Sequence, residues 1–126
     1  MVGVGIDIVE VSEVEAALRA HPGRYIDRVY TPAEQRAGRR ADGTPDPQVL
    51  AALFAAKEAA LKALRPAGEA VPWLSIEIRA DCRGFTLSGA AERLARQRGV
   101  AELSLDLTRT RRYAAAVVLA CGEENA

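Results

Sequence analysis

The sequence contains few residues that could form covalent or metal crosslinks. Cys82 and Cys121 are its only two cysteines, and their spacing matches neither a disulfide framework nor a zinc site. We therefore interpret both as reduced thiols of a cytosolic protein that pack as small apolar side chains. The chain also lacks net charge, because 17 basic and 17 acidic side chains cancel. Bulk charge thus gives no indication of nucleic acid or an anionic membrane as a partner.

Long apolar segments are missing as well. No hydrophobic run reaches the ~18 residues of a membrane-spanning helix, and the opening MVGVGIDIVE lacks the basic start of a signal peptide. We predict a cytoplasmic protein without membrane association. With 126 residues, 49% hydrophobic and 27% charged, the chain is predicted to form a single globular domain over residues 1–126.

The local patterns predict a mixed α+β fold. Alternating apolar residues predict a strand over 2–11, and the Ala- and Leu-rich segment 49–64 predicts the longest helix. Thr31-Pro32-Ala33-Glu34 has the residues of a capping box at a helix start. The other predicted elements are a short helix at 13–20 capped by Ser12, a loop at 38–48, strands at 74–80 and 84–88, a helix at 89–98, and a hairpin of strands 102–109 and 113–120. We expect a largely antiparallel sheet packed on the one long helix.

The long helix carries three charged residues that deserve a separate interpretation. Lys57 falls near the middle of the apolar stripe, where an unpaired ammonium is costly. For a lone lysine the simpler interpretation is that it snorkels or pairs with a carboxylate. Glu58 and Lys62 lie one turn apart at the edge of the stripe. Such a pair is common on exposed helices and contributes only ~0.2–0.5 kcal/mol.

Asp7 is unusual for a strand, because aspartate is disfavoured there. Its face also carries Gly3 and Gly5, which suggests room for a ligand beside it. One interpretation is a salt bridge from Asp7 to Lys57 or an arginine. The other is a hard cation held by Asp7 and Glu58, since Mg²⁺ takes one or two carboxylates and completes its shell with water and phosphate. Composition and spacing alone favour the salt bridge.

Four segments resemble, in order and spacing, the holo-acyl-carrier-protein synthases, the short single-domain branch of the 4′-phosphopantetheinyl transferase family. They are VGVGIDIVEV at 2–11, YIDRVYTPAE at 25–34, FAAKEAALKAL at 54–64 and YAAAVVLA at 113–120. Each segment is a weak signal by itself, but the ordered set covers nearly the whole chain. The resemblance implies the fold of that family.

The resemblance also implies a reaction. The 4′-phosphopantetheine arm of coenzyme A would move to a serine of an apo acyl carrier protein of the fatty-acid, polyketide or peptide type, with release of adenosine 3′,5′-bisphosphate. Asp7 and Glu58 are implied as Mg²⁺ ligands, and Asp7, Glu58 and Lys62 as catalytic residues. The residues implied to bind coenzyme A are Lys57, Lys62, Arg109 and Thr110.

The same resemblance implies partners. Short members of the family are homotrimers with active sites between subunits, and their carrier proteins are acidic. A basic docking patch is therefore expected. The candidates for it are Arg19, Arg24, Arg28, Arg36, Arg39 and Arg40.

Several positions depart from the family pattern. Leu53 stands where an arginine is usual, Arg109 where a histidine is usual, and Glu13 where an arginine is usual. Arg65-Pro66-Ala67-Gly68 replaces a Gly-rich turn. Arg109 offers a guanidinium that suits phosphate. The departures leave two alternatives to the enzyme: a catalytically weakened or non-catalytic relative that binds coenzyme A or a partner protein, and a structural domain in which these charges only pair.

Overall fold

The computed structural model describes residues 2–123. In chain order its elements are β1 (Gly3–Glu10), α1 (Val11–Ala20), α2 (Pro22–Val29), α3 (Pro32–Ala37), α4 (Pro47–Leu64), the 3₁₀ turn η1 (Trp73–Ser75), β2 (Ile76–Ile78), β3 (Phe85–Leu87), α5 (Gly89–Gln97), β4 (Glu102–Arg109) and β5 (Tyr113–Cys121). None of the helices within residues 2–123 is both long and apolar enough to cross a membrane.

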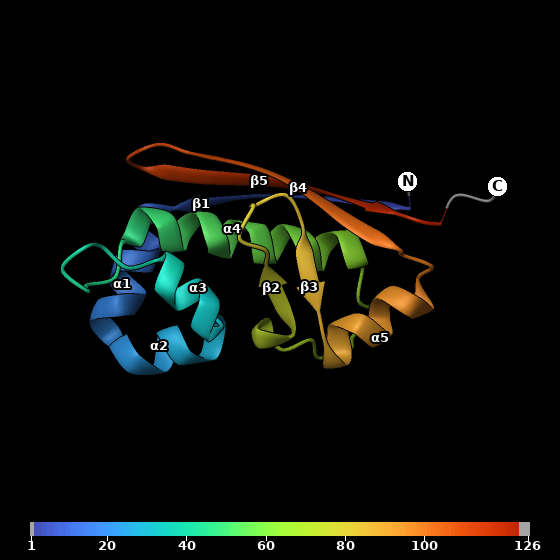
Figure 1. The fold of residues 1–126 in the computed structure, drawn as a ribbon, viewed down its shortest axis with the longest axis horizontal. Coiled ribbons are helices and arrows are strands. Elements are labelled where there is room, and N and C mark those ends of the chain that lie inside the picture. The colour runs from blue at the N-terminus through green and yellow to red at the C-terminus, as the bar shows by residue number, and fades with distance from the viewer. Residues whose placement is uncertain (1, 124–126) are drawn as a thin grey trace.

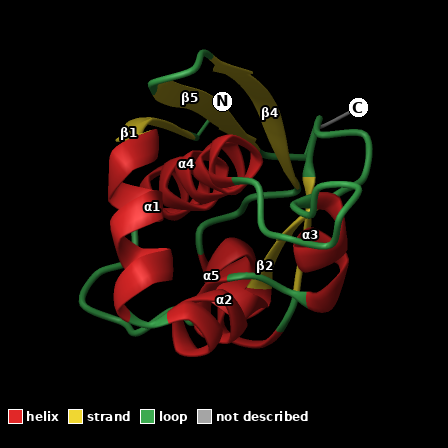
Figure 2. Cartoon of the chain, turned by 90° about the vertical axis from the view of Figure 1, so that its left-hand side faces the viewer, coloured by secondary structure: helices red, strands yellow, loops and turns green. Residues whose placement is uncertain are grey.

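The predicted α+β architecture is confirmed. β1, β5 and β4 form an antiparallel sheet in that order, and β2 and β3 form a separate antiparallel hairpin. Helix α4 lies beneath the sheet along its length (Figure 1). Below it lie α2 and α3 toward one end, the β2–β3 hairpin in the middle and α5 at the other end, while α1 runs beside α4 down to α2 (Figures 1 and 2). The three-layer order is also visible when the molecule is seen end-on (Figure 2).

Helix α4 begins two residues earlier than predicted, at Pro47, because the Asp46 side chain caps it by accepting a hydrogen bond from the Gln48 amide at 3.0 Å. Its C-terminal cap is Arg65, which adopts the left-handed conformation with φ of 54°. Alanine dominates the buried face of α4, so its backbone can approach the sheet closely.

The space beside Gly3 and Gly5 is not free for a ligand, and this corrects the expectation from the sequence. A Cβ at Gly3 would lie 2.5 Å from the Ala63 carbonyl oxygen, and a Cβ at Gly5 would overlap the Ala59 carbonyl oxygen. Both glycines therefore serve to bring the α4 backbone against β1.

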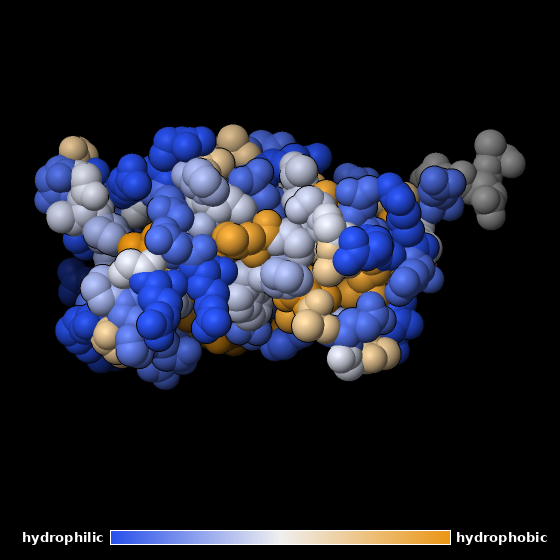
Figure 3. Space-filling model, turned by 90° about the horizontal axis from the view of Figure 1, so that it is seen from below, coloured by the Kyte–Doolittle hydropathy of each residue, from blue (hydrophilic) through white to orange (hydrophobic). Residues whose placement is uncertain are grey.

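The opposite face of β1 is apolar and open. Val4, Ile6 and Ile8 point away from α4, and Ile6 and Ile8 are 61% and 66% exposed. Leu119 of β5 lies directly beside Val4 and is also exposed. No element of the described chain covers this outer face of the sheet (Figure 1). The face of the molecule opposite the sheet is mostly polar (Figure 3). The largest apolar area on it lies toward the end that carries β3 and α5.

The other local predictions have mixed outcomes. The capping box is confirmed, since the Thr31 hydroxyl accepts from the Glu34 amide and the Glu34 carboxylate accepts from the Thr31 amide. The cap at Ser12 is wrong: α1 starts at Val11, and the Ser12 hydroxyl donates to Glu10 instead. The patterns did not predict α2, and a 3₁₀ turn occupies the start of the strand predicted at 74–80.

Candidate active site

Asp7 and Lys62 meet where β1 crosses α4. The Lys62 Nζ atom lies 2.7 Å from Asp7 Oδ1 and also donates to the Ile6 carbonyl oxygen at 3.1 Å. The salt-bridge interpretation of Asp7 named Lys57 or an arginine as the partner, and the structure shows Lys62 instead. The ammonium group is thereby held directly beside the Asp7 carboxylate.

Glu58 lies one turn before Lys62 on α4 and completes this group. Its half-buried carboxylate receives no hydrogen bond from any residue that the structure describes. Burial raises the pKa of Glu58, the negative charges of Asp7 and Glu13 raise it further, and Lys62 acts in the opposite direction. Two carboxylates, Asp7 and Glu58, thus share the single ammonium group of Lys62.

The carboxylate pair matches the requirements of a hard divalent cation. Within residues 2–123 no three or more His, Cys, Asp or Glu side chains form a metal cluster. Two carboxylates nevertheless suffice for Mg²⁺, which keeps several water or phosphate ligands. Asp7 and Glu58 repel each other and lack a full countercharge, and this is the environment that a cation would relieve.

Neutralising Glu58 is expected to stabilise the metal-free protein. Because its pKa is raised in the folded state, the folded protein keeps this proton to higher pH than the unfolded chain, and stability falls as pH rises through the folded pKa. Glu58→Gln removes this cost, so its melting temperature with EDTA should exceed that of wild type by a few degrees at most near neutral pH. The difference should shrink toward acid pH, whereas Glu69→Gln, at an exposed position, should show neither effect.

Lys57 does not join this group. Its side chain is fully buried, at 0% exposure, and its Nζ atom contacts Glu34 Oε1 at 2.8 Å and the carbonyl oxygens of Trp73 and Ile76 at 2.9 and 2.5 Å. Its three donors are therefore used inside the protein. The prediction that Lys57 contacts coenzyme A has no support in this geometry, and pairing with a carboxylate is the interpretation that fits.

Arg109 and Thr110 lie at the turn between β4 and β5, away from the carboxylates. Strand β5 separates them from Asp7, since Asp7 pairs with Ala116 of β5, whose partner on β4 is Leu107. The Thr110 hydroxyl accepts hydrogen bonds from the Arg112 and Tyr113 amides at 3.3 and 3.1 Å. Thr110 thus shapes the turn, and Arg109 is exposed beside it.

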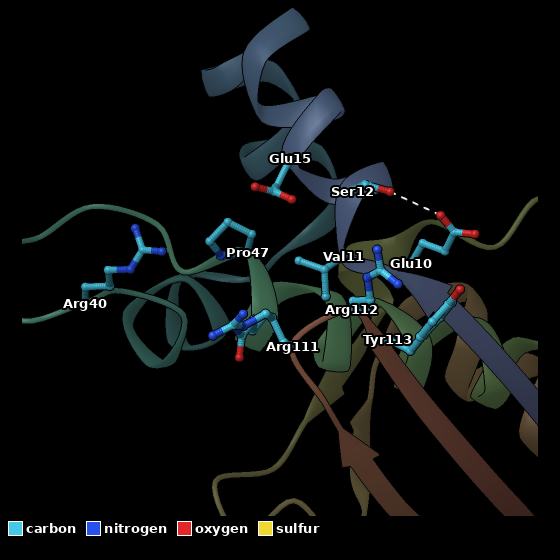
Figure 4. Close-up of a pocket in the computed structure, with 10 residues that line it drawn as sticks. Glu10, Val11, Ser12, Glu15, Arg40, Pro47, Arg111, Arg112 and Tyr113 are labelled. Atoms are coloured by element: carbon cyan, nitrogen blue, oxygen red, sulfur yellow. Dashed lines mark hydrogen bonds between the residues drawn. The ribbon is translucent and has the colours of Figure 1, made fainter.

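This turn borders a cavity of about 540 Å³ that the sequence patterns did not reveal. Three arginines line it, Arg40 from the loop before α4 and Arg111 and Arg112 from the turn (Figure 4). The other lining residues are Glu10, Val11, Ser12, Glu15, Pro47, Gln48 and Tyr113. None of the three arginines forms a salt bridge within the described chain. In the sequence, the one signal for an anion-binding site here is the pair of adjacent arginines, Arg111 and Arg112, that follows Thr110.

The departures from the family pattern fall in three settings. Leu53 is 5% exposed and belongs to the core, so no polar ligand reaches it. Glu13 is exposed on α1 and lies close enough to Glu58 to raise its pKa. The Arg65 carbonyl oxygen accepts a hydrogen bond from Arg98 at 2.7 Å, which anchors the turn after α4.

Comparison with known proteins identifies the family. A family profile described as the 4′-phosphopantetheinyl transferase superfamily matches residues 3–118. The holo-[acyl-carrier-protein] synthase of Moorella thermoacetica is 41% identical over 94% of this chain and 93% of its own length. The chain belongs to the holo-acyl-carrier-protein synthases of the 4′-phosphopantetheinyl transferase superfamily, and it is an enzyme of that class.

Solved structures agree with this assignment. The holo-ACP-synthase of Plasmodium yoelii has the same fold, with a TM-score of 0.84, 24% identity, and coverage of 98% of this chain and 97% of its own. The Helicobacter pylori synthase, solved in complex with coenzyme A, has a TM-score of 0.77 and 25% identity, and covers 94% of this chain and 99% of its own.

Proposed function

We propose that this protein transfers the 4′-phosphopantetheine arm of coenzyme A to a serine of an apo acyl carrier protein in a Mg²⁺-dependent reaction that releases adenosine 3′,5′-bisphosphate. The observation that carries the proposal is the grouping of Asp7, Glu58 and Lys62 at the crossing of β1 and α4. Family membership supports the transfer, and the H. pylori relative in complex with coenzyme A supports the donor.

Asp7 and Glu58 would hold the cation, and Lys62 would act beside them. Bound Mg²⁺ supplies positive charge that stabilises the negative oxygens of a diphosphate in the transition state. The Lys62 ammonium, fixed by Asp7 and the Ile6 carbonyl, adds a second positive charge at the same place. This arrangement favours catalysis by positioning and charge stabilisation, as phosphoryl transfer requires.

The arginine-lined cavity would bind phosphate groups of coenzyme A. Arg40, Arg111 and Arg112 all line it and form no salt bridge in the described chain (Figure 4). Arginine suits phosphate because its planar group donates two parallel hydrogen bonds. Glu10, three residues from Asp7 on β1, also lines the cavity. The backbone positions of the two residues are ~10 Å apart along the strand, and their side chains leave β1 on opposite faces. Arg109 and Thr110 adjoin it in the same turn.

The docking surface for the carrier would be formed by the exposed arginines. Arg19, Arg24, Arg28, Arg36, Arg39 and Arg40 are all exposed and form no salt bridge with any described residue. They suit an acidic partner. Glu13, on α1, would repel such a partner locally, so we propose a dedicated carrier, of the fatty-acid, polyketide or peptide type, whose surface tolerates this charge.

We further propose a cytoplasmic homotrimer in which this single domain is the subunit. The open outer face of the sheet supports assembly, because a contiguous apolar face is costly in water. The two cysteines are not bonded to each other, which suits a reducing compartment.

Ile8→Arg is expected to dissociate the assembly. Ile8 is 66% exposed on the outer face of the sheet, so a buried arginine at the interface would cost far more than it does in a monomer. Light scattering after size-exclusion chromatography should show a trimer for wild type and a monomer for the variant. Leu74→Arg is the matched control, because Leu74 is 46% exposed but lies in η1. Equal masses for all three proteins would contradict the proposed interface.

Intact mass spectrometry of several apo carrier proteins, incubated with the protein, coenzyme A and Mg²⁺, tests the proposed reaction. We expect one carrier at least to gain the mass of the phosphopantetheine arm, and EDTA to abolish the gain. Folded wild-type protein that binds coenzyme A but modifies no carrier would favour the non-catalytic alternative, which Leu53 and Arg109 suggest.

A further inference from the structure

We propose that the buried ion pair between Glu34 and Lys57 is a positioning device that orients Glu58 in the active site. The inference rests on the proposed function, because it assigns Glu58 a role in the reaction. Glu34 and Lys57 would act through the backbone of α4 and would not touch the substrate.

The ammonium of Lys57 is held from three directions. Its Nζ atom donates to Glu34 Oε1 at 2.8 Å and to the carbonyl oxygens of Trp73 at 2.9 Å and Ile76 at 2.5 Å. An ammonium has three donors, and all three have partners here. Burial lowers the pKa of Lys57, and the Glu34 carboxylate opposes this change.

The carboxylate of Glu34 is satisfied in the same way. Its Oε1 atom also accepts from the Thr31 amide at 2.9 Å, and its Oε2 atom accepts from the Ile78 amide at 2.8 Å. Glu34 is only 2% exposed, and no buried side-chain nitrogen or oxygen within residues 2–123 lacks a partner. The network thus joins α3, η1 and β2 to one point on α4.

Stability alone does not account for such a pair. Apolar side chains of similar size often stabilise a core as well as a buried ion pair does, because both charges lose their hydration. An ion pair with five directional hydrogen bonds differs from apolar packing, because it fixes both the rotation of α4 about its axis and the position of α4 along that axis. Glu58 follows Lys57 directly, at 100° around the helix, so fixing the rotation of α4 at Lys57 also sets the direction in which the Glu58 side chain leaves the helix.

Close packing against β1 also fixes α4 from its other side. The α4 backbone at Ala59 and Ala63 contacts β1 at Gly5 and Gly3, and β1 carries Asp7. The ion pair and the glycine contact together set the distance between the Asp7 and Glu58 carboxylates. A displacement of ~1 Å at a reacting centre lowers the rate by up to ~10²-fold.

The test is the double variant Glu34→Gln/Lys57→Met, which removes both charges and leaves no unpaired ion. We expect it to fold, to keep its KM for coenzyme A within about threefold, and to lose about tenfold or more in kcat, with a raised Mg²⁺ requirement. Leu94→Ala is the control for lost stability, because Leu94 is buried in α5; it should keep wild-type kcat and Mg²⁺ requirement.

The outcomes separate the two proposals. Wild-type transfer together with unchanged kcat and Mg²⁺ requirement in the folded double variant overturns the positioning role alone. Wild-type protein that transfers nothing overturns the proposed function and this inference with it. If the double variant does not fold, Glu34→Asp decides by the same measurements, because it keeps both charges but shortens the side chain that holds Lys57; wild-type values for it overturn the positioning role.

Discussion

Replacing Glu58 with glutamine is expected to lower kcat for carrier modification by ~10²-fold or more. The change removes one of two carboxylates at the crossing of β1 and α4 and leaves size and packing nearly the same. The amide is a much weaker ligand for Mg²⁺ than a carboxylate. Because metal-free Glu58→Gln is expected to be slightly more stable than wild type, lost activity cannot be attributed to unfolding. Rates are measured by intact mass spectrometry of the carrier over time.

Asp7→Asn is expected to lose activity to a similar degree, and it also frees Lys62 from its ion pair. Glu69→Gln, at an exposed position outside the site, is the matched control and should retain the wild-type rate. A Glu58→Gln variant that is as fast as this control would remove Glu58 from the proposed site.

Gly5→Ala is expected to damage the fold more than an alanine at any other glycine of residues 2–123. The added Cβ would overlap the Ala59 carbonyl oxygen, and both β1 and α4 are constrained by their neighbours. We expect the free energy of unfolding to fall by about 3 kcal/mol or more, which corresponds to a fall in melting temperature of ~10 °C or more. Calorimetry or circular dichroism measures both.

Gly23→Ala is the control for this substitution. Nothing lies within 4 Å of a Cβ at Gly23, which is in helix α2, so alanine there should be neutral or stabilising by ~0.5–1 kcal/mol. Similar melting temperatures for Gly5→Ala and Gly23→Ala would show that α4 does not pack against β1 as closely as described.

Local features of the fold were predictable because neighbouring residues determine them. The capping box of Thr31 and Glu34 and the helical character of the alanine-rich segment are properties of a few adjacent residues. The sequence could not show that Glu34 also pairs with Lys57, because that contact depends on how α3 packs against α4.

Glycine and apolar residues on β1 show a second limit. The sequence showed that Gly3 and Gly5 leave space on their face of the strand. It did not show whether a ligand or the α4 backbone fills that space. Alternation likewise predicted two faces of the strand without showing that Ile6 and Ile8 lie on the open one. The partner of Asp7 depends in the same way on the register between β1 and α4, which places Lys62 beside it.

Binding of Mn²⁺ as a spectroscopic substitute for Mg²⁺, measured by electron paramagnetic resonance in the presence of coenzyme A, is the most direct test of the metal pair. One ion per active site should bind to wild type. Asp7→Asn and Glu58→Gln should each weaken binding by about tenfold or more, because the loss of a residue that only hydrogen-bonds to a metal ligand already has an effect of that size. Affinity that is unchanged in both variants would show that these two carboxylates do not hold the ion.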